Sequence, residues 1–440
     1  RGENLVWHPD HMRHRYSNWV EGLNGDWLIS RQRYFGVPVP VWYPIDAEGE
    51  TVHDSPIVPS EDRLPIDPST DVPLGYTADQ RNQPNGFIGD PDVMDTWATS
   101  SLSPQIAGKW EDDADLFGRI FPMDLRPQAH DIIRTWLFST VVRSNFEHDS
   151  LPWKNAALSG WILDPDRKKM SKSKGNVVTP VDLFEKFGSD AVRYWAASAR
   201  PGIDTAFSED QMKVGKKLAT KLLNATKFVL TFPQPDVDAK PTHPVDLAML
   251  ARVAETVREA TVAFDQYDYA RALERTEAMF WWFCDDYVEL VKGRVYNSQG
   301  PDASGSAISA LRLALSALQR LLAPFMPFTT ETVWRWWQSG SVHTTSWPTE
   351  DELGPLGDSA ILDPIGEILS QVRRAKTDAK TSQKTAVTEA TISASESVLA
   401  AFELGRGDLS DAGSVRSWVT KPSAGETTVS AVLAPPEPAS

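Results

Sequence analysis

Lys169-Met170-Ser171-Lys172-Ser173-Lys174-Gly175-Asn176 is a cationic segment that follows an apolar run, residues 157–163, and a turn-like Asp164-Pro165-Asp166. The apolar run predicts a strand, so the lysine segment begins just after a strand end. In open α/β sheets ligands gather at the carboxyl ends of strands, where a mobile loop can reach a bound phosphate. Lys169 and Lys172 can then stabilise negative charge that develops on phosphoryl oxygens during a displacement. A solvated basic loop is the ordinary alternative.

Length and composition limit the class of protein to which this loop can belong. At 440 residues the chain is too long for one ordinary domain, and two or three are expected. Hydrophobic residues make up 41% of it, and no apolar run is long enough to cross a bilayer, so we expect a soluble monomer without membrane contact. Its single cysteine, Cys284, lies in an aromatic run, which predicts a packing role, no cysteine-rich zinc site and a cytoplasmic location.

Charge is distributed unevenly along the chain. The formal net charge of −16 argues against a globally basic surface for nucleic acid. Two local windows are nevertheless basic: residues 211–230 hold five lysines and no acidic residue, and residues 371–384 hold five basic residues and one aspartate. A solvated helix face and a phosphate-binding surface explain either window equally well.

Apolar spacing of three and four residues begins near residue 210 and predicts an antiparallel helical bundle. The expected helices span 211–231, 244–264, 267–294, 307–322 and 330–337. We expect residues 206–345 to own a closed core and to fold alone. Farther along, the pattern predicts a helix over 364–380, a strand over 387–393, a helix over 395–403, strands over 415–419 and 427–433, and a disordered tail from 434. Residues 44–90, rich in Pro, Asp and Gly, are predicted to form an irregular surface insertion.

Several motifs resemble those of one known family. The order Lys-Met-Ser-Lys-Ser at 169–173 resembles the signature of class I aminoacyl-tRNA synthetases. Residues 29–36 resemble the Ile-Ser-Arg-Gln-Arg-Tyr-Trp-Gly stretch of the valyl, isoleucyl and leucyl members, with Phe35 replacing tryptophan. Residues 92–101 and 129–136 resemble Asp-Val-Leu-Asp-Thr-Trp-Phe-Ser-Ser and Gly-His-Asp-Ile-Ile-Arg-Thr-Trp of the valyl type, with Ala98 and Ala129 as departures. They favour the valyl type over the isoleucyl type, which stays as the alternative.

The resemblance implies a fold and a reaction. The expected fold is α/β: the second half of a Rossmann-like catalytic domain over 1–205, an all-α anticodon-binding bundle over 206–345, and a small α/β appendage over 346–440. The expected reaction is ATP-dependent activation of valine to the aminoacyl adenylate and its transfer to tRNA(Val), with Mg²⁺ accompanying ATP. None of the eight histidines forms the family's His-x-Gly-His motif, and the editing insertion is not recognisable. We therefore expect a C-terminal portion that is inactive alone; a non-catalytic tRNA-binding module is the alternative if the chain is complete.

The resemblance also assigns roles to residues. Lys169 and Lys172 would act in catalysis, and no residue is expected to ligate a metal. The residues expected to hold ATP are Met170, Ser171, Lys172, Ser173, His130 and Asp131. Those expected to enclose valine are Trp97, Ile132 and Trp136. Those expected to contact tRNA are Lys213, Lys216, Lys217, Arg373 and Arg374.

Overall fold

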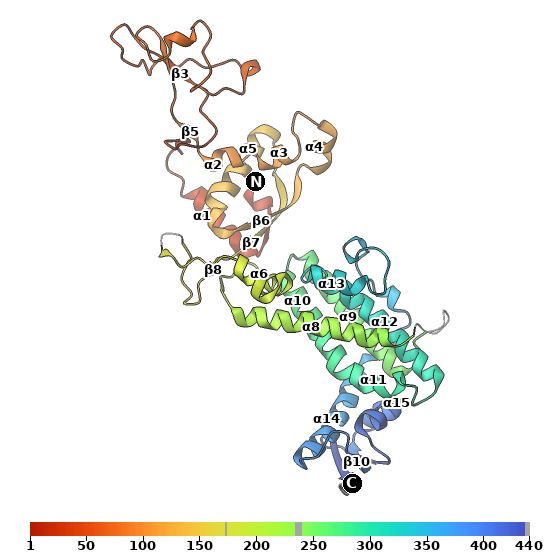
Figure 1. The fold of residues 1–440 in the computed structure, drawn as a ribbon. Coiled ribbons are helices and arrows are strands. Elements are labelled where there is room, and N and C mark those ends of the chain that lie inside the picture. The colour runs from red at the N-terminus through yellow and green to blue at the C-terminus, as the bar shows by residue number, and fades with distance from the viewer. Residues whose placement is uncertain (172–173, 234–239, 436–440) are drawn as a thin grey trace. The chain divides into compact units, whose positions relative to one another are not determined.

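The computed structural model describes residues 1–171, 174–233 and 240–435 (Figure 1). Its contacts divide the chain into two compact units. The first unit comprises Arg1–Trp161 with Pro201–Asp204, and the second comprises Ile162–Arg200 with Thr205–Ser440. The domain bounds expected from the sequence, 1–205, 206–345 and 346–440, remain a prediction beside this division.

A parallel three-stranded sheet forms the centre of the first unit. Its order is β1-β7-β6, from β1 (Val6–His8), β7 (Trp153–Ser159) and β6 (Met123–Ala129). Helix α5 (Phe138–His148) connects β6 to β7, as parallel neighbours require. Apolar side chains from the sheet and its helices form one buried cluster that includes Trp7, Leu137 and Trp153. The carboxyl ends of all three strands therefore meet at one edge of the sheet.

The other elements of the first unit are short. They are α1 (Arg13–Glu21), α2 (Thr96–Ser100), α3 (Ser103–Ala107), α4 (Ala114–Ile120), a π-helix (Ile133–Leu137), and the paired strands β2 (Ser30–Arg31) with β5 (Val93–Met94) and β3 (Trp42–Pro44) with β4 (Phe87–Gly89). Residues 44–90 are mainly turns, as predicted, although Phe87 within the segment and Trp42 just before it are fully buried and give it a small core. The β2–β5 pair closes the neck of this insertion.

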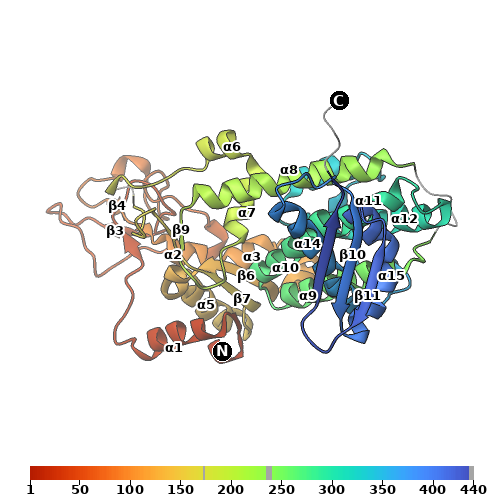
Figure 2. The same cartoon turned by 90° about the horizontal axis from the view of Figure 1, so that it is seen from below.

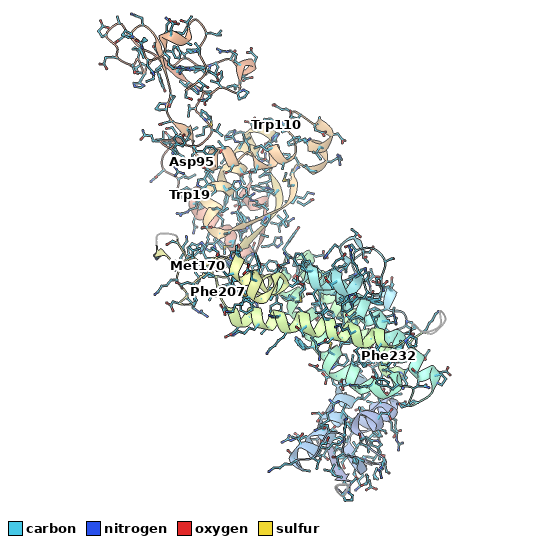
Figure 3. The ribbon with its side chains drawn as sticks, in the orientation of Figure 1. Trp19, Asp95, Trp110, Met170, Phe207 and Phe232 are labelled. Atoms are coloured by element: carbon cyan, nitrogen blue, oxygen red, sulfur yellow. The ribbon has the colours of Figure 1, made fainter. Side chains whose placement is uncertain are left out.

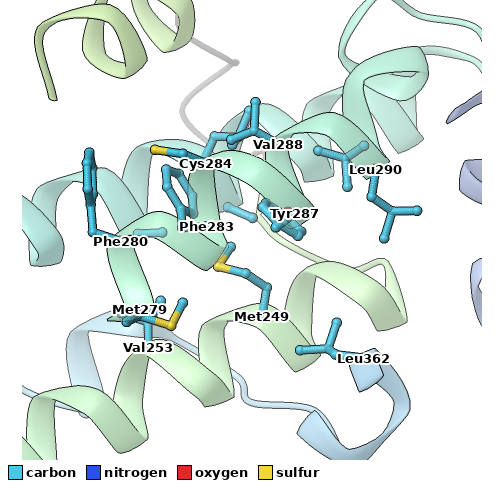
Figure 4. Close-up of a cluster of buried hydrophobic side chains, with 14 of the residues drawn as sticks. Met249, Val253, Met279, Phe280, Phe283, Cys284, Tyr287, Val288, Leu290 and Leu362 are labelled. Carbon is cyan, nitrogen blue, oxygen red and sulfur yellow. The ribbon is translucent and has the colours of Figure 1, made fainter. Parts of the chain in front are cut away.

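Helices dominate the second unit. Strands β8 (Ile162–Leu163) and β9 (Thr205–Ala206) pair in parallel; α6 and α7 lie between them in the chain, and α8 to α13 follow β9. The helices are α6 (Val181–Phe187), α7 (Ser189–Ala197), α8 (Glu209–Thr231), α9 (Pro244–Asp265), α10 (Tyr269–Trp282), α11 (Val288–Val295), α12 (Pro301–Leu322) and α13 (Pro327–Trp334). The predicted helices are confirmed except over 267–294, where a π-helix, Phe283–Tyr287, interrupts the α-helical path. Figure 4 shows Phe283, Cys284 and Tyr287 of this turn among buried side chains of the bundle.

The C-terminal part has one sheet and two helices. Strand β10 (Val387–Ala394) lies between β11 (Trp418–Pro422), which is parallel to it, and β12 (Thr428–Leu433), which is antiparallel. Helices α14 (Leu362–Asp378) and α15 (Glu396–Gly413) pack against the sheet and each other (Figure 2). Helix α15 runs ten residues past the predicted end at 403, because Gly405 does not break it. A Cβ built on Gly405 would lie 2.7 Å from Cδ1 of Ile365, so the absence of a side chain lets α14 and α15 approach closely.

The expectation that residues 206–345 own a closed core is wrong. One buried apolar cluster continues from the bundle into α14, β10 and α15, with Leu362, Ile368 and Phe402 among its members. The sequence pattern shows that each helix has an apolar face but not which neighbour covers it. Here α14 and α15 cover faces of α9 and α11, so the bundle depends on the C-terminal part.

A buried ion network joins the same two parts. Arg294 on α11 is fully buried and donates from both Nη atoms to Asp246 on α9, at 2.8 and 2.7 Å, and from Nε to Asp408 on α15, at 2.6 Å. Tyr287 and Ser306 hydroxyls also donate to Asp246, at 2.7 and 2.6 Å. Asp246 is thus fully satisfied, whereas Oδ2 of Asp408 has no partner within the described chain.

Candidate functional site

His130 lies at the edge where the parallel strands end. It follows β6 directly, is buried, and its Nδ1 lies 3.1 Å from the carbonyl oxygen of Ser159 at the end of β7. The imidazole ring also packs against Trp161, with 4.7 Å between ring centroids. If Nδ1–H donates to the Ser159 carbonyl, Nε2 is the nitrogen able to accept a bond from a ligand. The ends of two strands therefore fix this ring in place.

A cavity of about 440 Å³ opens beside His130. Its lining residues are Arg15, Asn18, Trp19, His130, Asp131, Ile133, Arg134 and Trp161. Trp19 is labelled in Figure 3. Asp131 is exposed and can accept a bond from an ammonium group or a ribose hydroxyl, and the indole rings offer flat apolar surfaces. His130 and Asp131, two of the six residues predicted to hold ATP, thus line one cavity.

Asp95 organises the segment that carries Trp97. Its Oδ1 accepts the backbone N–H of Trp97 at 2.8 Å, which caps helix α2. Its Oδ2 forms an ion pair with Nε of Arg31 at 2.8 Å, and Asp95 itself is only 8% exposed. The motifs around Arg31 and Asp95 lie far apart in the sequence, and neither residue was among the predicted site residues. The ion pair shows that the two motifs form a single structural unit.

Trp136 lies in the π-helix Ile133–Leu137 and bonds to α2. Its indole Nε1–H donates to the carbonyl oxygen of Ser100 at 2.9 Å, and so the helix of Trp97 is attached to the turn of Trp136. Both tryptophans and Ile132 are half-buried. The guanidinium of Arg126 lies over the Trp136 ring, and burial lowers the pKa of Arg126 to about 9. Sequence analysis missed Arg126, because a basic residue inside a strand gives no signal of its own.

The lysine loop belongs to the second unit and is held at its base by polar side chains. Asn176 accepts the backbone N–H of Ser171 at 3.0 Å and donates to Asp164 at 2.8 Å and to the carbonyl of Lys169 at 3.3 Å. Bonds from the Lys168 backbone and from Asn176 lower the pKa of Asp164. Lys169, Met170 and Ser171 are therefore placed on a closed polar loop, whereas Lys172 and Ser173 lie outside the described residues. The cavity at His130 and this loop are in different units, and each is described by itself.

The three lysines predicted to contact tRNA lie together on α8. Lys213, Lys216 and Lys217 line a groove of about 680 Å³ with Lys186, Lys221 and Trp281. Three of these cations are paired: Lys186 with Glu209 at 2.7 Å, Lys213 with Asp210 at 2.8 Å and Lys221 with Asp285 at 2.6 Å.

The two predicted arginines lie elsewhere. Arg373 lines a second, smaller cavity, and Arg374 is 82% exposed and 3.8 Å from Asp378. We call the surface of Lys186, Lys213, Lys216, Lys217, Lys221 and Trp281 the lysine groove.

Within the described ranges, no cluster of three or more His, Cys, Asp or Glu side chains could hold a metal ion. Among those residues there is also no helix with the length and apolar character that a bilayer crossing requires.

Comparison with known proteins identifies two family matches. Residues 1–208 match the model "tRNA synthetases class I (I, L, M and V)", and residues 246–392 match "Anticodon-binding domain of tRNA ligase". The chain is similar to a valine--tRNA ligase of Thermobifida fusca (60% identity, 95% of this chain, 48% of the relative) and to one of Salinispora arenicola (57%, 94% and 51%). It therefore spans about half the length of the curated relatives it matches.

Solved structures show the same fold. A ternary complex of Agrobacterium radiobacter K84 LeuRS with tRNA and LeuAMS aligns with a TM-score of 0.57 at 20% identity, over 75% of this chain and 44% of that one. Mycobacterium tuberculosis methionyl-tRNA synthetase in complex with methionyl-adenylate aligns at 0.51 and 21%, over 74% and 57%. The fold class expected from the sequence, part of a synthetase catalytic domain followed by a helical anticodon-binding domain, is confirmed. Residues 1–208 belong to the class I tRNA synthetases of the isoleucine, leucine, methionine and valine group, and residues 246–392 belong to the anticodon-binding domains of tRNA ligases.

Proposed function

We propose that this chain is the part of a valine--tRNA ligase that carries the lysine loop, one side of the valine site and the tRNA-binding helices. The observation that carries the proposal is the link from Arg31 through Asp95 and α2 to Trp136, at 2.8 and 2.9 Å. It joins three of the synthetase-like motifs, of which those at 92–101 and 129–136 resemble the valyl type, into one structural unit. The similarity to valine--tRNA ligases supports the same reaction.

In this proposal the chemistry depends on positioning and charge. The valine carboxylate attacks the α-phosphorus of MgATP, pyrophosphate leaves, and the adenylate then acylates the 3′ end of tRNA(Val). Lys169 and Lys172 stabilise the charge that develops on the phosphates, and no protein nucleophile is needed. His130 and Asp131 hold the nucleotide in the cavity beside the sheet edge, and Met170, Ser171 and Ser173 shape the loop around the phosphates.

Trp97, Ile132 and Trp136 form the amino-acid site. Indole faces and a β-branched side chain match an isopropyl group by shape, with no polar partner for the substrate side chain. The bond from Trp136 to Ser100 fixes the relative positions of the two tryptophan-bearing segments. Such a site excludes larger side chains by size.

The lysine groove, with Arg373 and Arg374 on α14, is proposed to bind tRNA through its phosphates. The spacing of three and four residues places Lys213, Lys216 and Lys217 on one face of α8, and Lys186 of α6 adds a further cation to the same groove. We further propose a monomer that acts in the cytoplasm, with domains at 1–205, 206–345 and 346–440.

A split-enzyme experiment tests the proposal. The 440-residue chain is assayed for valine-dependent pyrophosphate exchange alone, and again with the N-terminal part of the Thermobifida fusca relative, the part that this chain does not match. We expect negligible exchange alone and measurable exchange with the complement, abolished by Lys172→Ala. Exchange by the chain alone would show that it is catalytically complete. Salt-sensitive tRNA binding without exchange in the mixture would favour the non-catalytic module, and preference for isoleucine would favour the isoleucyl type.

A further inference from the structure

The chain contains two Asn-Gly sequences, Asn24-Gly25 and Asn85-Gly86. In such a pair the backbone nitrogen of glycine can attack the side-chain amide of asparagine, because glycine has no Cβ to obstruct the approach. The attack requires a glycine nitrogen without a hydrogen-bond partner and a backbone that is free to turn. The two pairs carry the same chemistry, so their surroundings decide where the reaction occurs.

The first pair lies in an open stretch between α1 and β2. Asn24 and Gly25 are both exposed, and a Cβ built on Gly25 would meet no atom within 4 Å. Within the part of the chain that the structure describes, the backbone of residues 24–27 and the Asn24 side chain make no hydrogen bond. A segment with so few bonds opens at little cost in free energy. The Gly25 nitrogen is therefore available to the Asn24 side chain.

The second pair is held by backbone hydrogen bonds. Gly86 is buried, its N–H donates to the carbonyl oxygen of Gln83 at 2.9 Å, and its own carbonyl accepts the N–H of Ile45 at 2.9 Å. A Cβ built on Gly86 would collide with the carbonyl oxygen of Gln80, so the turn has no room to rearrange. The nitrogen that would have to attack in this pair is thus bonded and fixed.

We propose that Asn24 is a site of self-modification, at which the folded chain converts its own side-chain amide to a carboxylate. The Gly25 nitrogen loses its proton and bonds to the side-chain carbonyl carbon of Asn24, the bond from that carbon to the amide nitrogen breaks, and ammonia leaves with the proton. Water then opens the five-membered imide at either carbonyl, which gives aspartate or isoaspartate at position 24. Water is the only other reactant, so the step needs no oxidant and no cofactor.

The product changes a cavity of about 400 Å³ that Asn24 helps to line. Asp26 and Arg134 are the charged groups among its lining residues. Arg134 also lines the cavity beside His130, and within the described ranges it forms no hydrogen bond or ion pair. A carboxylate at position 24 adds a second negative charge, so the charges of the lining no longer balance. The inference does not depend on the proposed function, because it follows from the loop and from no ligand.

Incubation of the purified 440-residue chain at pH 8 tests the inference. Peptide mapping by mass spectrometry follows the conversion of amide to acid at both pairs. A purified isoaspartyl methyltransferase, supplied with labelled S-adenosylmethionine, detects isoaspartate, which the imide gives and direct hydrolysis of the amide does not. Gly25→Ala is the matched variant: its methyl group has space and the backbone at Gly25 does not have a positive φ, but the new Cβ obstructs the attack. The same chain in urea is the control in which neither pair is held.

We expect Asn24 to react at least about tenfold faster than Asn85 in the folded chain, because Asn85 reacts only after the buried hydrogen bond of Gly86 is broken. Isoaspartate should be detected at position 24. In urea the two pairs should react at similar rates. Gly25→Ala should remove most of the reaction at position 24 and leave the rate at Asn85 unchanged.

Three results would overturn the inference. An intact Asn24 in the folded chain, under conditions in which it reacts in urea, would show that the loop protects it. Equal rates at the two pairs in the folded chain would show that the structure does not select the site. Conversion at position 24 without isoaspartate, or at an unchanged rate in Gly25→Ala, would show that the Gly25 nitrogen is not the attacking group.

Discussion

Neutralising Asp408 should leave the chain at least as stable as before, although the residue belongs to a buried salt bridge. Arg294 serves two carboxylates, and Asp246 takes both Nη atoms and two hydroxyl donors, while Asp408 receives Nε. Two negative charges thus share one positive charge in a site without solvent. Burial raises the pKa of Asp408 from 3.8 to about 6, and the contact with Arg294 only partly offsets it.

The sign and size of the effect follow from this pKa. Because the folded-state pKa lies above the unfolded one, the folded chain binds the proton more tightly. The resulting stability is fully present below pH 3.8 and is lost as the pH rises through about 6. At 1.36 kcal/mol per pH unit, the loss amounts to about 3 kcal/mol. Asp408→Asn resembles the protonated form at every pH and should therefore avoid this loss of stability.

The matched variant is Asp246→Asn. It leaves Arg294 with one weaker partner in a fully buried position, and breaking a buried pair in this way costs roughly 3–5 kcal/mol. Urea denaturation between pH 4 and 7.5 measures the free energy of unfolding of both variants. Hydrogen exchange in peptides of α11 and α15 serves as the probe, so that the measurement reports on this part of the chain. We expect the stability advantage of Asp408→Asn over the unsubstituted chain to grow from near zero at pH 4 to at most about 3 kcal/mol at pH 7. Equal losses in the two variants, or an advantage independent of pH, would refute the reasoning.

Three further predictions concern chemistry. With the complementing N-terminal part present, Lys172→Ala should lower the rate of adenylate formation by roughly 3 kcal/mol of transition-state stabilisation, with little change in valine affinity; near-normal pyrophosphate exchange would contradict its role. The same mixture should exclude isoleucine yet reject threonine only about a hundredfold, a figure known for valyl synthetases and not one worked out from this structure. Better activation of isoleucine than of valine would overturn the assignment. Cys284, whose pKa is raised to about 12 by burial, should resist alkylation at pH 8 in the native chain and react at once in urea.

Local signals in the sequence were sufficient for most of the secondary structure. Apolar spacing located α8, α9 and α12, because each helix carries a stripe that must be buried whatever covers it. The π-helix at Phe283–Tyr287 gave no such signal, since one extra residue in a turn hardly alters the spacing. The end of α15 was predicted too early: Gly405 lies inside the helix, where the absence of a side chain allows close packing against Ile365.

The candidate site shows a similar limit. Motifs identified His130, Asp131, Trp97 and Trp136, yet their order along the chain does not reveal the ion pair of Arg31 with Asp95. That contact joins residues 64 positions apart, which the β2–β5 pairing and the neighbouring backbone bonds bring together. The position of Arg126 against Trp136 depends in the same way on how the strand is packed.

The neck formed by β2 and β5 has a consequence for engineering and for evolution. Ser30 pairs with Met94 and Arg31 with Val93 through their backbones, and the ion pair between the Arg31 and Asp95 side chains joins the two segments at the same place. Residues 37–39 also bond to residues 92–94, so the segment between residues 40 and 91 is attached through this neck. Helix α2 begins just beyond the neck. Each doubling of the length of a flexible loop attached in this way costs only about 0.6 kcal/mol of loop-closure entropy. The segment can therefore be shortened, lengthened or replaced by a reporter domain while Trp97 keeps its place.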